Sequence, residues 1–248
     1  MSVSWKHCLV VGASSGIGEA VARRLGVQGA RVALLARRAA ELERVGEAIR
    51  AQGGEPFLYP HDVRDFDSVA ALFDRIVSDL GGLDLVVYAA GVMPKIEEGE
   101  YDSTKDREMV EVNLLGAIAW LNPAAAHFEA RRGGTLVGIS SIAGERGRRG
   151  NPVYCTSKAG LTAYLEALRN RCTRYGVSVV TIKPGFVDTP MTRGLPGLFW
   201  LISADEAARR ILVIARRSSA SGFVPRRWAL VALVVRMLPS FVFRRLNF

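Results

Sequence analysis

Short apolar runs alternate along the chain with longer segments whose apolar residues recur at helical spacing. The first run, residues 7–11, ends at a glycine, and the segment that follows it, residues 16–28, has helical periodicity. Residues 85–89 are apolar throughout, as expected of a parallel strand that is covered on both faces. Strands are predicted at residues 7–11, 31–36, 55–59, 83–89, 135–140, 177–183 and, at an edge, 222–224. Helices are predicted at residues 16–28, 39–51, 65–80, 103–131, 152–175 and 203–217.

This alternation predicts a single-domain α/β fold in which about seven strands form one parallel, doubly wound sheet of the Rossmann-like type. The sequence contains no linker, internal repeat or low-complexity segment. We therefore expect one domain, with residues 1–225 as its cofactor-binding and catalytic body and residues 226–248 as a tail that belongs to it. Within the helical region 103–131, Pro123 is expected to kink or divide the helix, because proline lacks a backbone N–H.

The composition narrows the classes of ligand. The chain carries 33 Lys and Arg residues against 24 Asp and Glu, a net charge of +9, which suits nucleic acid, a phosphorylated cofactor or an anionic membrane face. No basic stripe is interleaved with aromatic residues, so we expect no nucleic-acid partner. Cys8, Cys155 and Cys172 lack metal-ligand spacing and are expected to be buried thiols in a reducing compartment, with no metal site. The first apolar run is too short for a signal peptide, so a cytoplasmic location is expected.

A glycine-rich turn, Gly-Ala-Ser-Ser-Gly-Ile-Gly at residues 12–18, joins the first predicted strand to the first predicted helix. Such a turn lets the backbone approach a pyrophosphate and directs helix N–H groups toward it. The spacing is G-x-x-x-G-x-G rather than the commoner G-x-G-x-x-G, but the strand-to-helix context predicts dinucleotide binding. The expected contacts are Gly12, Ser14, Ser15, Gly16, Ile17 and Gly18.

The residues after the second predicted strand distinguish the two nicotinamide dinucleotides. NAD sites usually place a carboxylate there for the ribose hydroxyls, whereas this chain has Arg37 and Arg38. A guanidinium binds a phosphate bidentately and stacks on adenine, so NADP(H) is favoured over NAD(H). A solvated helix start is the alternative for both arginines, and for Arg38 in particular. After the third predicted strand, Asp62 is expected either to accept from the adenine amine or to cap the next helix, and Val63 follows it.

Tyr154 and Lys158 are the candidate catalytic pair, since a spacing of four residues stacks both side chains on one face of the predicted helix 152–175. A free phenol has a pKa of about 10, and a neighbouring cation stabilises the phenolate and lowers that pKa toward neutrality. Ser141 adds a hydroxyl nearby in sequence. Taken alone, a Tyr-x-x-x-Lys pair is equally typical of an ordinary solvated helix face.

The glycine turn, Asn113, Ser141, the pair Tyr154 and Lys158, and the segment Pro-Gly-Phe-Val-Asp-Thr-Pro at residues 184–190 together resemble the short-chain dehydrogenase/reductase family. The resemblance covers residues 6–223. It implies that Tyr154 donates a proton to a carbonyl oxygen while the nicotinamide delivers hydride, and that Lys158 holds the nicotinamide ribose and lowers the pKa of Tyr154. It also implies that Ser141 binds the substrate oxygen and that Asn113 supports a proton-relay water.

The same resemblance extends the cofactor site along the edge of the sheet. The implied contacts are Ala90, Gly91, Lys158, Pro184, Gly185, Val187 and Thr189, the last two at the nicotinamide carboxamide. Two positions depart from the family pattern: Val11 stands where Thr is common, and Tyr88-Ala89-Ala90-Gly91 replaces Asn-Asn-Ala-Gly. The lost Asn side chains remove hydrogen bonds that brace the central sheet and the cofactor loop, so the rigidity of this region is in question.

An apolar segment follows the nicotinamide loop at residues 195–202. The family covers its substrate with this segment, so Leu195, Phe199 and Trp200 are candidate contacts for an apolar or lipid-bearing substrate. Ordinary packing of a lid helix on the domain is the alternative.

The tail has an unusual composition. Residues 228–235 are apolar without a break and are flanked by Arg227 and Arg236, and aromatic residues and arginines follow Pro239. The stretch is far shorter than the ~20 residues that span a bilayer. Either the tail lies on the inner face of a membrane, with aromatic side chains inward and arginines toward anionic headgroups, or it packs between the subunits of a homodimer or homotetramer.

Three arginines lie in the loop between Ser141 and Tyr154. Arg146, Arg148 and Arg149 are candidates for binding a substrate phosphate, and a solvated loop is the alternative. This loop and the tail together resemble the decaprenylphosphoryl 2-keto-pentose reductases, whose substrate is a sugar ketone on a polyprenyl phosphate.

The resulting prediction is an NADP(H)-dependent oxidoreductase that interconverts a ketone and a secondary alcohol on a lipid-like or lipid-linked substrate. A soluble reductase of 3-oxoacyl thioesters, steroids or small ketones is the main alternative. A non-catalytic NADP-binding regulator is the third, and the presence of Asn113, Ser141, Tyr154 and Lys158 argues against it.

Overall fold

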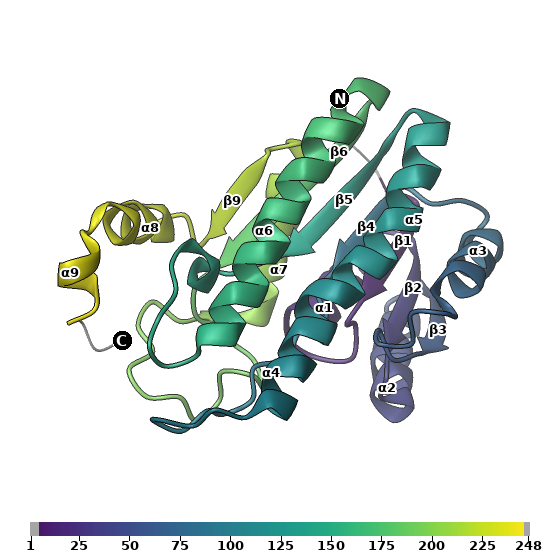
Figure 1. Ribbon diagram of the computed structural model, residues 1–248. Helices are drawn as coiled ribbons and strands as arrows, with labels where there is room; N and C mark the ends of the chain where they lie inside the picture. The colour runs from purple at the N-terminus through teal and green to yellow at the C-terminus, as the bar shows by residue number, and fades with distance from the viewer. Residues whose placement is uncertain (1–4, 246–248) are drawn as a thin grey trace.

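All seven predicted strands pair in one sheet in the computed structural model, which describes residues 5–245 (Figure 1). The strands are β1 (His7–Val11), β2 (Arg31–Ala36), β3 (Glu55–Pro60), β4 (Leu85–Tyr88), β5 (Gly134–Ile139), β6 (Val177–Pro184) and β9 (Ser221–Val224). Their order is β3-β2-β1-β4-β5-β6-β9, and every pairing is parallel. The predicted doubly wound sheet is confirmed, and the order reverses between β1 and β4, where such sheets bind ligands.

Helices cover both faces of the sheet because its central strands are apolar on both sides. Along β1, Val10 faces one core and Leu9 the other. The first core is covered by α1 (Gly16–Val27), α2 (Ala39–Arg50) and α7 (Ala204–Arg216). The second is covered by α3 (Val69–Leu80), α5 (Gly116–Arg131) and α6 (Pro152–Cys172), and Figure 1 shows α5 and α6 in front of the sheet.

Shorter elements connect these layers. They are α4 (Ser103–Val110), η1 (Glu111–Leu115), η2 (Ile142–Glu145), η3 (Thr173–Tyr175), β7 (Val187–Asp188), β8 (Ile202–Ser203), α8 (Trp228–Met237) and α9 (Ser240–Phe243). The last two belong to the tail and stand at the end of the molecule, away from the centre of the sheet (Figure 1).

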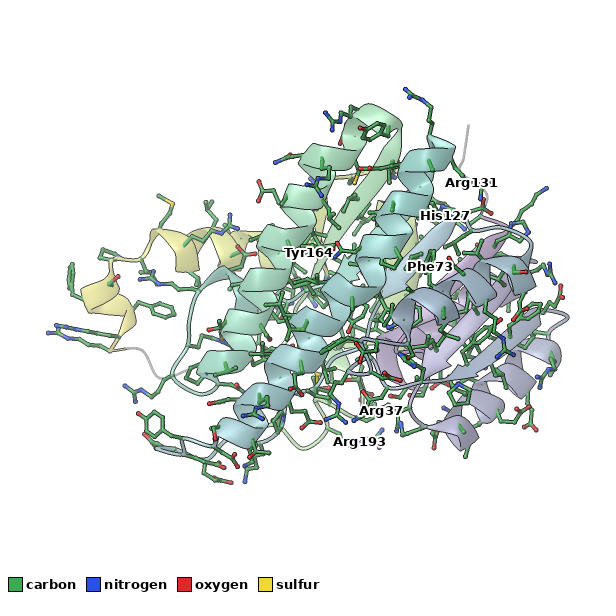
Figure 2. All side chains as sticks on the ribbon, turned by 45° about the vertical axis from the view of Figure 1, so that its right-hand side comes forward. Arg37, Phe73, His127, Arg131, Tyr164 and Arg193 are labelled. Atoms are coloured by element: carbon green, nitrogen blue, oxygen red, sulfur yellow. The ribbon has the colours of Figure 1, made fainter. Side chains whose placement is uncertain are left out.

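Aromatic and polar contacts join the helices of the second layer. The Phe73 ring of α3 meets the His127 ring of α5 with the ring centres 6.0 Å apart, and the Tyr164 hydroxyl of α6 donates to Asn122 of α5 at 2.8 Å (Figure 2). The first contact joins α3 to α5, and the second joins α6, which carries the candidate catalytic pair, to α5.

The long helical region 103–131 is divided, but not at Pro123. The division falls at η1, a π-helical turn, while α5 continues through Pro123 at a half-buried position. The region Ser103–Arg131 has the length and hydropathy of a membrane span, yet Trp120 and Phe128 are fully buried against the sheet, as in the core helix of a globular domain.

Two other predicted boundaries are corrected by side-chain hydrogen bonds. The predicted strand 83–89 is shorter, because Asp84 turns its carboxylate to accept from the N–H of His7 at 2.9 Å and the strand starts only at Leu85. The predicted helix 65–80 starts at Val69, because Asp65 accepts from the Ser68 hydroxyl at 2.7 Å in a preceding turn.

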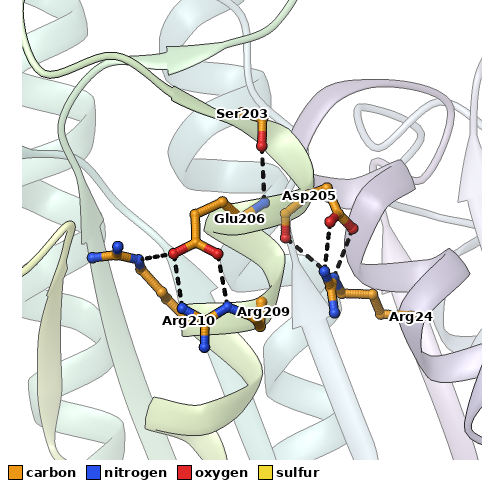
Figure 3. A network of polar contacts seen from close by, with 6 residues as sticks. All are labelled: Arg24, Ser203, Asp205, Glu206, Arg209 and Arg210. Carbon is orange, nitrogen blue, oxygen red and sulfur yellow. Dashed lines mark hydrogen bonds and ion pairs between the residues drawn. The ribbon is translucent and has the colours of Figure 1, made fainter.

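The start of α7 is held against α1 by a polar network (Figure 3). Ser203 caps α7 by accepting from the N–H of Glu206 at 3.1 Å. Arg24 of α1 donates from Nε to the Asp205 carboxylate at 2.7 Å. The network fixes the end of the apolar segment 195–202, because that segment leads directly into β8 and α7.

Candidate active site

The predicted catalytic residues lie around the carboxyl end of β5 and the first turns of α6. Ser141 is the second residue after β5 and caps η2, since its Oγ accepts from the N–H of Ala143 at 3.1 Å. Asn151 caps α6 by accepting from the N–H of Tyr154 at 3.0 Å, and a proline occupies the first turn. These caps set where α6 begins and therefore which way Tyr154 points.

Tyr154 and Lys158 face inward together. Their exposed fractions are only 7% and 4%. The Nζ of Lys158 lies 5.9 Å from the centre of the Tyr154 ring and donates to the carbonyl of Ile139, at the end of β5, at 3.0 Å. Ser140 holds the same turn, since its hydroxyl donates to the carbonyl of Lys158 at 2.9 Å. The predicted stacking is present, and the alternative of a solvated helix face is wrong.

Asn113 reaches the same place from η1. Its side chain is fully buried: Oδ1 accepts from the N–H of Val92 at 2.7 Å, and Nδ2 donates to the Val92 carbonyl at 3.0 Å and to Ser157 at 3.1 Å. A Cβ on Gly91 would lie 3.3 Å from Asn113 Oδ1 and 3.4 Å from Lys158 Nζ. The π turn thus brings Asn113 to Gly91 and Lys158.

Tyr88, at the end of β4, is a supporting residue that the sequence analysis missed. Its ring is fully buried, and its hydroxyl donates to the carbonyl of Val112, in η1, at 2.6 Å. A Cβ on Gly116, just after η1, would come within 2.6 Å of this hydroxyl. Tyr88 therefore braces the turn that carries Asn113, at the position where the family pattern has an Asn side chain. A phenol at a position usually held by Asn was the signal available in the sequence.

Burial acts on the ionisation of both catalytic groups. It raises the pKa of the Tyr154 phenol, and a hydrogen bond with Ser141 and the charge of Arg148 oppose only part of this effect. The predicted lowering of this pKa toward neutrality is therefore wrong. Burial lowers the pKa of the Lys158 ammonium to about 8. At neutral pH the phenol is therefore protonated and the ammonium is charged, so Tyr154 is in the state that donates a proton.

The glycine turn forms a cradle against the loop after β4. Gly12 has a φ of +88°, and a Cβ there would lie 2.4 Å from the backbone nitrogen of Ala90. A Cβ on Gly18 would lie 2.1 Å from the carbonyl oxygen of Gly12. Ser15, the N-cap of α1, makes no side-chain capping hydrogen bond, so the first N–H groups of α1 stay available to an anion. The residues present fit the pyrophosphate of a dinucleotide.

Arg38, rather than Arg37, lies against this turn. Its Nη2 donates to the hydroxyls of Ser14 and Ser15 at 2.9 and 2.8 Å. It also lines a groove of about 800 Å³ that starts at Ser15 and runs between α1, α2 and the start of α7. Arg38 is also exposed at the N-cap of α2, so it stands at a solvated helix start, as the alternative predicts, while its guanidinium lies against the glycine turn.

The Asp62 carboxylate forms ion pairs at the edge of the site. Its carboxylate lies 2.7 Å from the guanidinium of Arg64 and 3.8 Å from that of Arg37, which lowers the pKa of Asp62. It does not cap α3, whose N-cap is Ser68, so that alternative is wrong. Val63 is buried in the second core rather than open to a ligand.

The predicted nicotinamide loop faces the glycine turn. A Cβ on Gly16 would lie 3.2 Å from Cγ2 of Thr189. Val187 is buried in β7, and its carbonyl accepts from the Thr192 hydroxyl at 2.6 Å. Pro184 ends β6, and the N–H of Gly185 donates to the carbonyl of Val224 in β9 at 2.9 Å. The cradle and the loop are thus parts of one site. Ile17 lies on its inner side, packed against the first core.

A match over most of the chain decides its family. Residues 6–196 match the family described as short chain dehydrogenase, and this range includes the glycine turn and all four predicted catalytic residues. The chain belongs to the short-chain dehydrogenases. It is an oxidoreductase that acts on hydroxyl and carbonyl groups with a nicotinamide dinucleotide as cofactor.

Two relatives and one solved structure illustrate the likeness. A cis-4-hydroxycyclohexanecarboxylate dehydrogenase of Sinomonas cyclohexanicum is 36% identical over 189 residues, which are 76% of this chain and 76% of that protein. A 3-oxoacyl-[acyl-carrier-protein] reductase of Homo sapiens is 35% identical over 193 residues, 77% of this chain and 79% of that protein. The crystal structure of a short-chain type dehydrogenase/reductase from Mycobacterium marinum has a TM-score of 0.82 at 26% identity, over 90% of this chain and 93% of that one.

In this short-chain dehydrogenase the apolar segment after the nicotinamide loop is irregular between residues 195 and 201, so the alternative of a packed lid helix is wrong. Phe199 packs against Phe186 and Trp228, with ring centres 5.5 and 5.0 Å apart. Arg227 lies over the Trp200 ring at 4.8 Å. The predicted substrate contacts remain partly exposed: Leu195, Phe199 and Trp200. The segment is thus joined to the start of the tail by aromatic packing.

The dehydrogenase uses Arg146 to hold its tail, which corrects the prediction that this side chain binds substrate. Its Nη1 donates to the carbonyls of Val235, at 2.7 Å, and Leu238, around the end of α8. Its guanidinium also lies 4.1 Å from the centre of the Phe243 ring. The last carbonyls of a helix lack partners inside it, so Arg146 satisfies groups that need a donor.

Arg148 and Arg149 differ from Arg146 and from each other. Arg149 is exposed and donates to the carbonyl of Arg244 in the tail at 3.5 Å. Arg148 lies close enough to Tyr154 for its charge to lower the pKa of the phenol. Its Nε is buried and finds no acceptor among residues 5–245. Of the three predicted phosphate ligands, Arg148 is the one with a buried donor that meets no acceptor among the described residues.

An ionic cluster around the buried carboxylate of Glu145 completes the link between the catalytic loop and the tail. The Glu145 side chain is 1% exposed, and its carboxylate lies 2.7 Å from Lys183 Nζ at the end of β6. Arg236 of α8 binds the other carboxylate oxygen. We refer to Glu145, Arg146, Lys183 and Arg236 as the tail clasp. It fixes the loop between Ser141 and Tyr154 to α8.

Proposed function

We propose that the protein is an NADP(H)-dependent reductase that interconverts a ketone and a secondary alcohol. The observation that carries this proposal is the buried Tyr154 phenol, which lies beside Lys158 and hydrogen bonds with Ser141. A buried acid next to a fixed cation is suited to protonating a carbonyl oxygen. NADPH-dependent reduction of a panel of ketones, compared between the wild type and a Tyr154→Phe variant, tests it.

Each of the four side chains has a distinct role in this proposal. Ser141 donates a hydrogen bond to the substrate oxygen, and Tyr154 transfers its proton to the same oxygen. The bound nicotinamide supplies the hydride that reduces the carbonyl carbon. Lys158 would hold the nicotinamide ribose, and its charge stabilises the phenolate that proton transfer leaves behind. The Asn113 side chain hydrogen bonds with Val92 and Ser157, so Asn113 acts as a positioning residue. In the oxidative direction Tyr154 accepts the proton.

The preference for NADP(H) rests on Arg38. Its guanidinium lies against the glycine turn, and the carboxylate usual in NAD sites is missing after β2. An Arg38→Ala variant is expected to bind NADPH about 10- to 100-fold more weakly and NADH unchanged, since a hydrogen bond to a charged group contributes roughly 1.5–3 kcal/mol. Fluorescence titration with both cofactors measures this. An Arg37→Ala variant is the control, with a smaller loss, because Arg37 already lies near Asp62 and Glu108. Equal losses for NADPH and NADH would contradict the assignment.

Catalysis should depend on the charge of Lys158. Its pKa of about 8 means that the ammonium is charged below that pH and neutral above it. Above pH 8 the cation that favours the phenolate is gone, so kcat/KM for ketone reduction should fall as pH rises through about 8. This quantity reports the pKa values of the free enzyme. In a Lys158→Arg variant the fall near pH 8 should disappear, because arginine stays charged. A wild-type profile that stays flat through pH 8 would speak against this role.

A lipid-like or lipid-linked ketone is the proposed substrate class. Arg148 offers a donor near Tyr154 for an anionic group, and Leu195, Phe199 and Trp200 offer exposed apolar surface. A soluble 3-oxoacyl thioester reductase is the second candidate, favoured by the similarity to the human 3-oxoacyl-[acyl-carrier-protein] reductase. Rates of NADPH oxidation with ketones that differ in chain length and in the presence of a phosphate, compared with a 3-oxoacyl thioester, separate the two.

A further inference from the structure

We infer that the outer face of α8 and α9 is a docking surface for an anionic membrane. The inner face of α8 packs as expected of a surface helix, since Trp228 and Ala232 are buried against the body of the protein. The outer face of α8 departs from the pattern of a surface helix. A surface helix normally carries polar residues toward solvent. Here a second apolar stripe at helical spacing points outward: Leu230, Leu233, Val234 and Met237.

These side chains are open to a partner. Met237 is 74% exposed and Leu230 is 66% exposed. Phe241 of α9 is also exposed, and the exposed rings of Phe199 and Trp200 pack against Trp228 at the start of α8. Figure 1 shows α8 and α9 at one end of the molecule, away from the centre of the sheet. Exposed apolar side chains gathered on one helix face mark an interaction site.

The charges beside the stripe identify its partner. The sequence from residue 207 to residue 245 contains no Asp or Glu. Four arginines border the stripe outside the tail clasp, Arg226, Arg227, Arg244 and Arg245, whereas Arg236 is paired with Glu145. An apolar helix face flanked by arginines is the arrangement that lies in the interface of a bilayer with anionic headgroups.

The same charges disfavour a second copy of this chain as the partner. A two-fold interface brings the same patch of both subunits together. Arg226, Arg227, Arg244 and Arg245 of one tail would then face those of the other, and no carboxylate between residues 207 and 245 would offset them. An anionic lipid surface lacks this conflict and satisfies both the apolar stripe and the charges.

The tail presents this face in a fixed orientation. The tail clasp binds α8 through Arg146 and Arg236, and a Cβ on Gly185 would lie 2.0 Å from the Trp228 ring, so the start of α8 packs directly on the backbone after β6. A docked membrane would therefore meet the segment that carries Phe199 and Trp200. The inference does not rest on the reductase activity, because docking is measured without turnover.

Co-sedimentation with lipid vesicles tests the inference. The full chain should sediment with vesicles of phosphatidylcholine and about one third phosphatidylglycerol, less with phosphatidylcholine alone, and less at high salt. A Leu230→Gln, Leu233→Gln, Met237→Gln variant should bind the anionic vesicles at least about 10-fold more weakly. A Phe66→Gln, Val213→Gln variant changes exposed apolar residues elsewhere and should bind like the wild type. Unchanged thermal unfolding and NADPH affinity confirm that each variant is folded.

Three results would overturn it: wild-type protein that ignores anionic vesicles, a triple variant that binds them as well as the wild type does, or a wild-type dimer that the triple variant converts to a monomer. Light scattering detects the last. If the triple variant fails to fold, the single Met237→Gln variant is tested by the same criteria. It changes the most exposed position of the stripe and should show a smaller loss of vesicle binding.

Discussion

Replacing Tyr154 by phenylalanine is expected to lower kcat for ketone reduction about 1,000-fold, because it removes the proton donor and a positioned acid contributes roughly 10²- to 10⁴-fold. The ring stays in its buried position and only the hydroxyl is lost, so the affinity for NADPH should stay within about 2-fold of the wild type. Steady-state rates followed by NADPH absorbance, together with a fluorescence titration of the cofactor, measure both quantities.

The matched control is Tyr164→Phe on the same helix. Its hydroxyl donates to Asn122 at 2.8 Å, outside the active site, so kcat should stay within about 2-fold of the wild type. A Tyr154→Phe enzyme that turns over like the control would remove the basis of the proposed chemistry. NADPH binding without turnover in the wild type would instead favour the non-catalytic regulator.

Replacing Glu145 by alanine is expected to destabilise the protein by about 3–5 kcal/mol, the cost of removing one partner from a buried ion pair. The variant leaves Lys183 buried at the end of β6 without its carboxylate, and it frees Arg236 of α8. For a chain of this length the midpoint of thermal unfolding should fall by about 10 °C. Thermal and urea unfolding at the same pH measure the loss.

An exposed ion pair provides the comparison. Glu43 lies 2.8 Å from Arg50 at the surface of α2, with about half of both side chains exposed. Glu43→Ala should therefore cost less than about 1 kcal/mol. If both alanine variants lost the same small amount, Glu145 would be only another surface carboxylate and the tail clasp would not anchor the loop.

Much of this structure follows from local sequence features. Strand and helix periods, the glycine turn and the spacing of Tyr154 and Lys158 depend on residues close together in the chain, so the seven strands and the catalytic pair were predictable. The roles of Arg37 and Arg38 were not, because adjacent arginines differ only in what the folded chain places beside them.

The missed features depend on distant partners. The π turn exists where Asn113 bonds Val92 and Ser157, contacts that no local pattern encodes. Arg146 resembles a loop arginine in sequence, and its acceptors lie some ninety residues later, at the end of a helix that was itself not predicted. That helix is apolar on both its inner and outer faces, so it lacks the one-sided periodicity by which helices are recognised.

The tail clasp has a consequence for biosynthesis. The ribosome makes a chain from its N-terminus, so the loop that contains Ser141 and Tyr154 emerges well before Arg236 does. In the nascent chain the sheet can form up to β6 while Glu145 has only Lys183 as a partner and Arg146 has no helix end to bind. The contacts between the loop and α8 therefore form only after α8 has been made, when most of the fold is already in place.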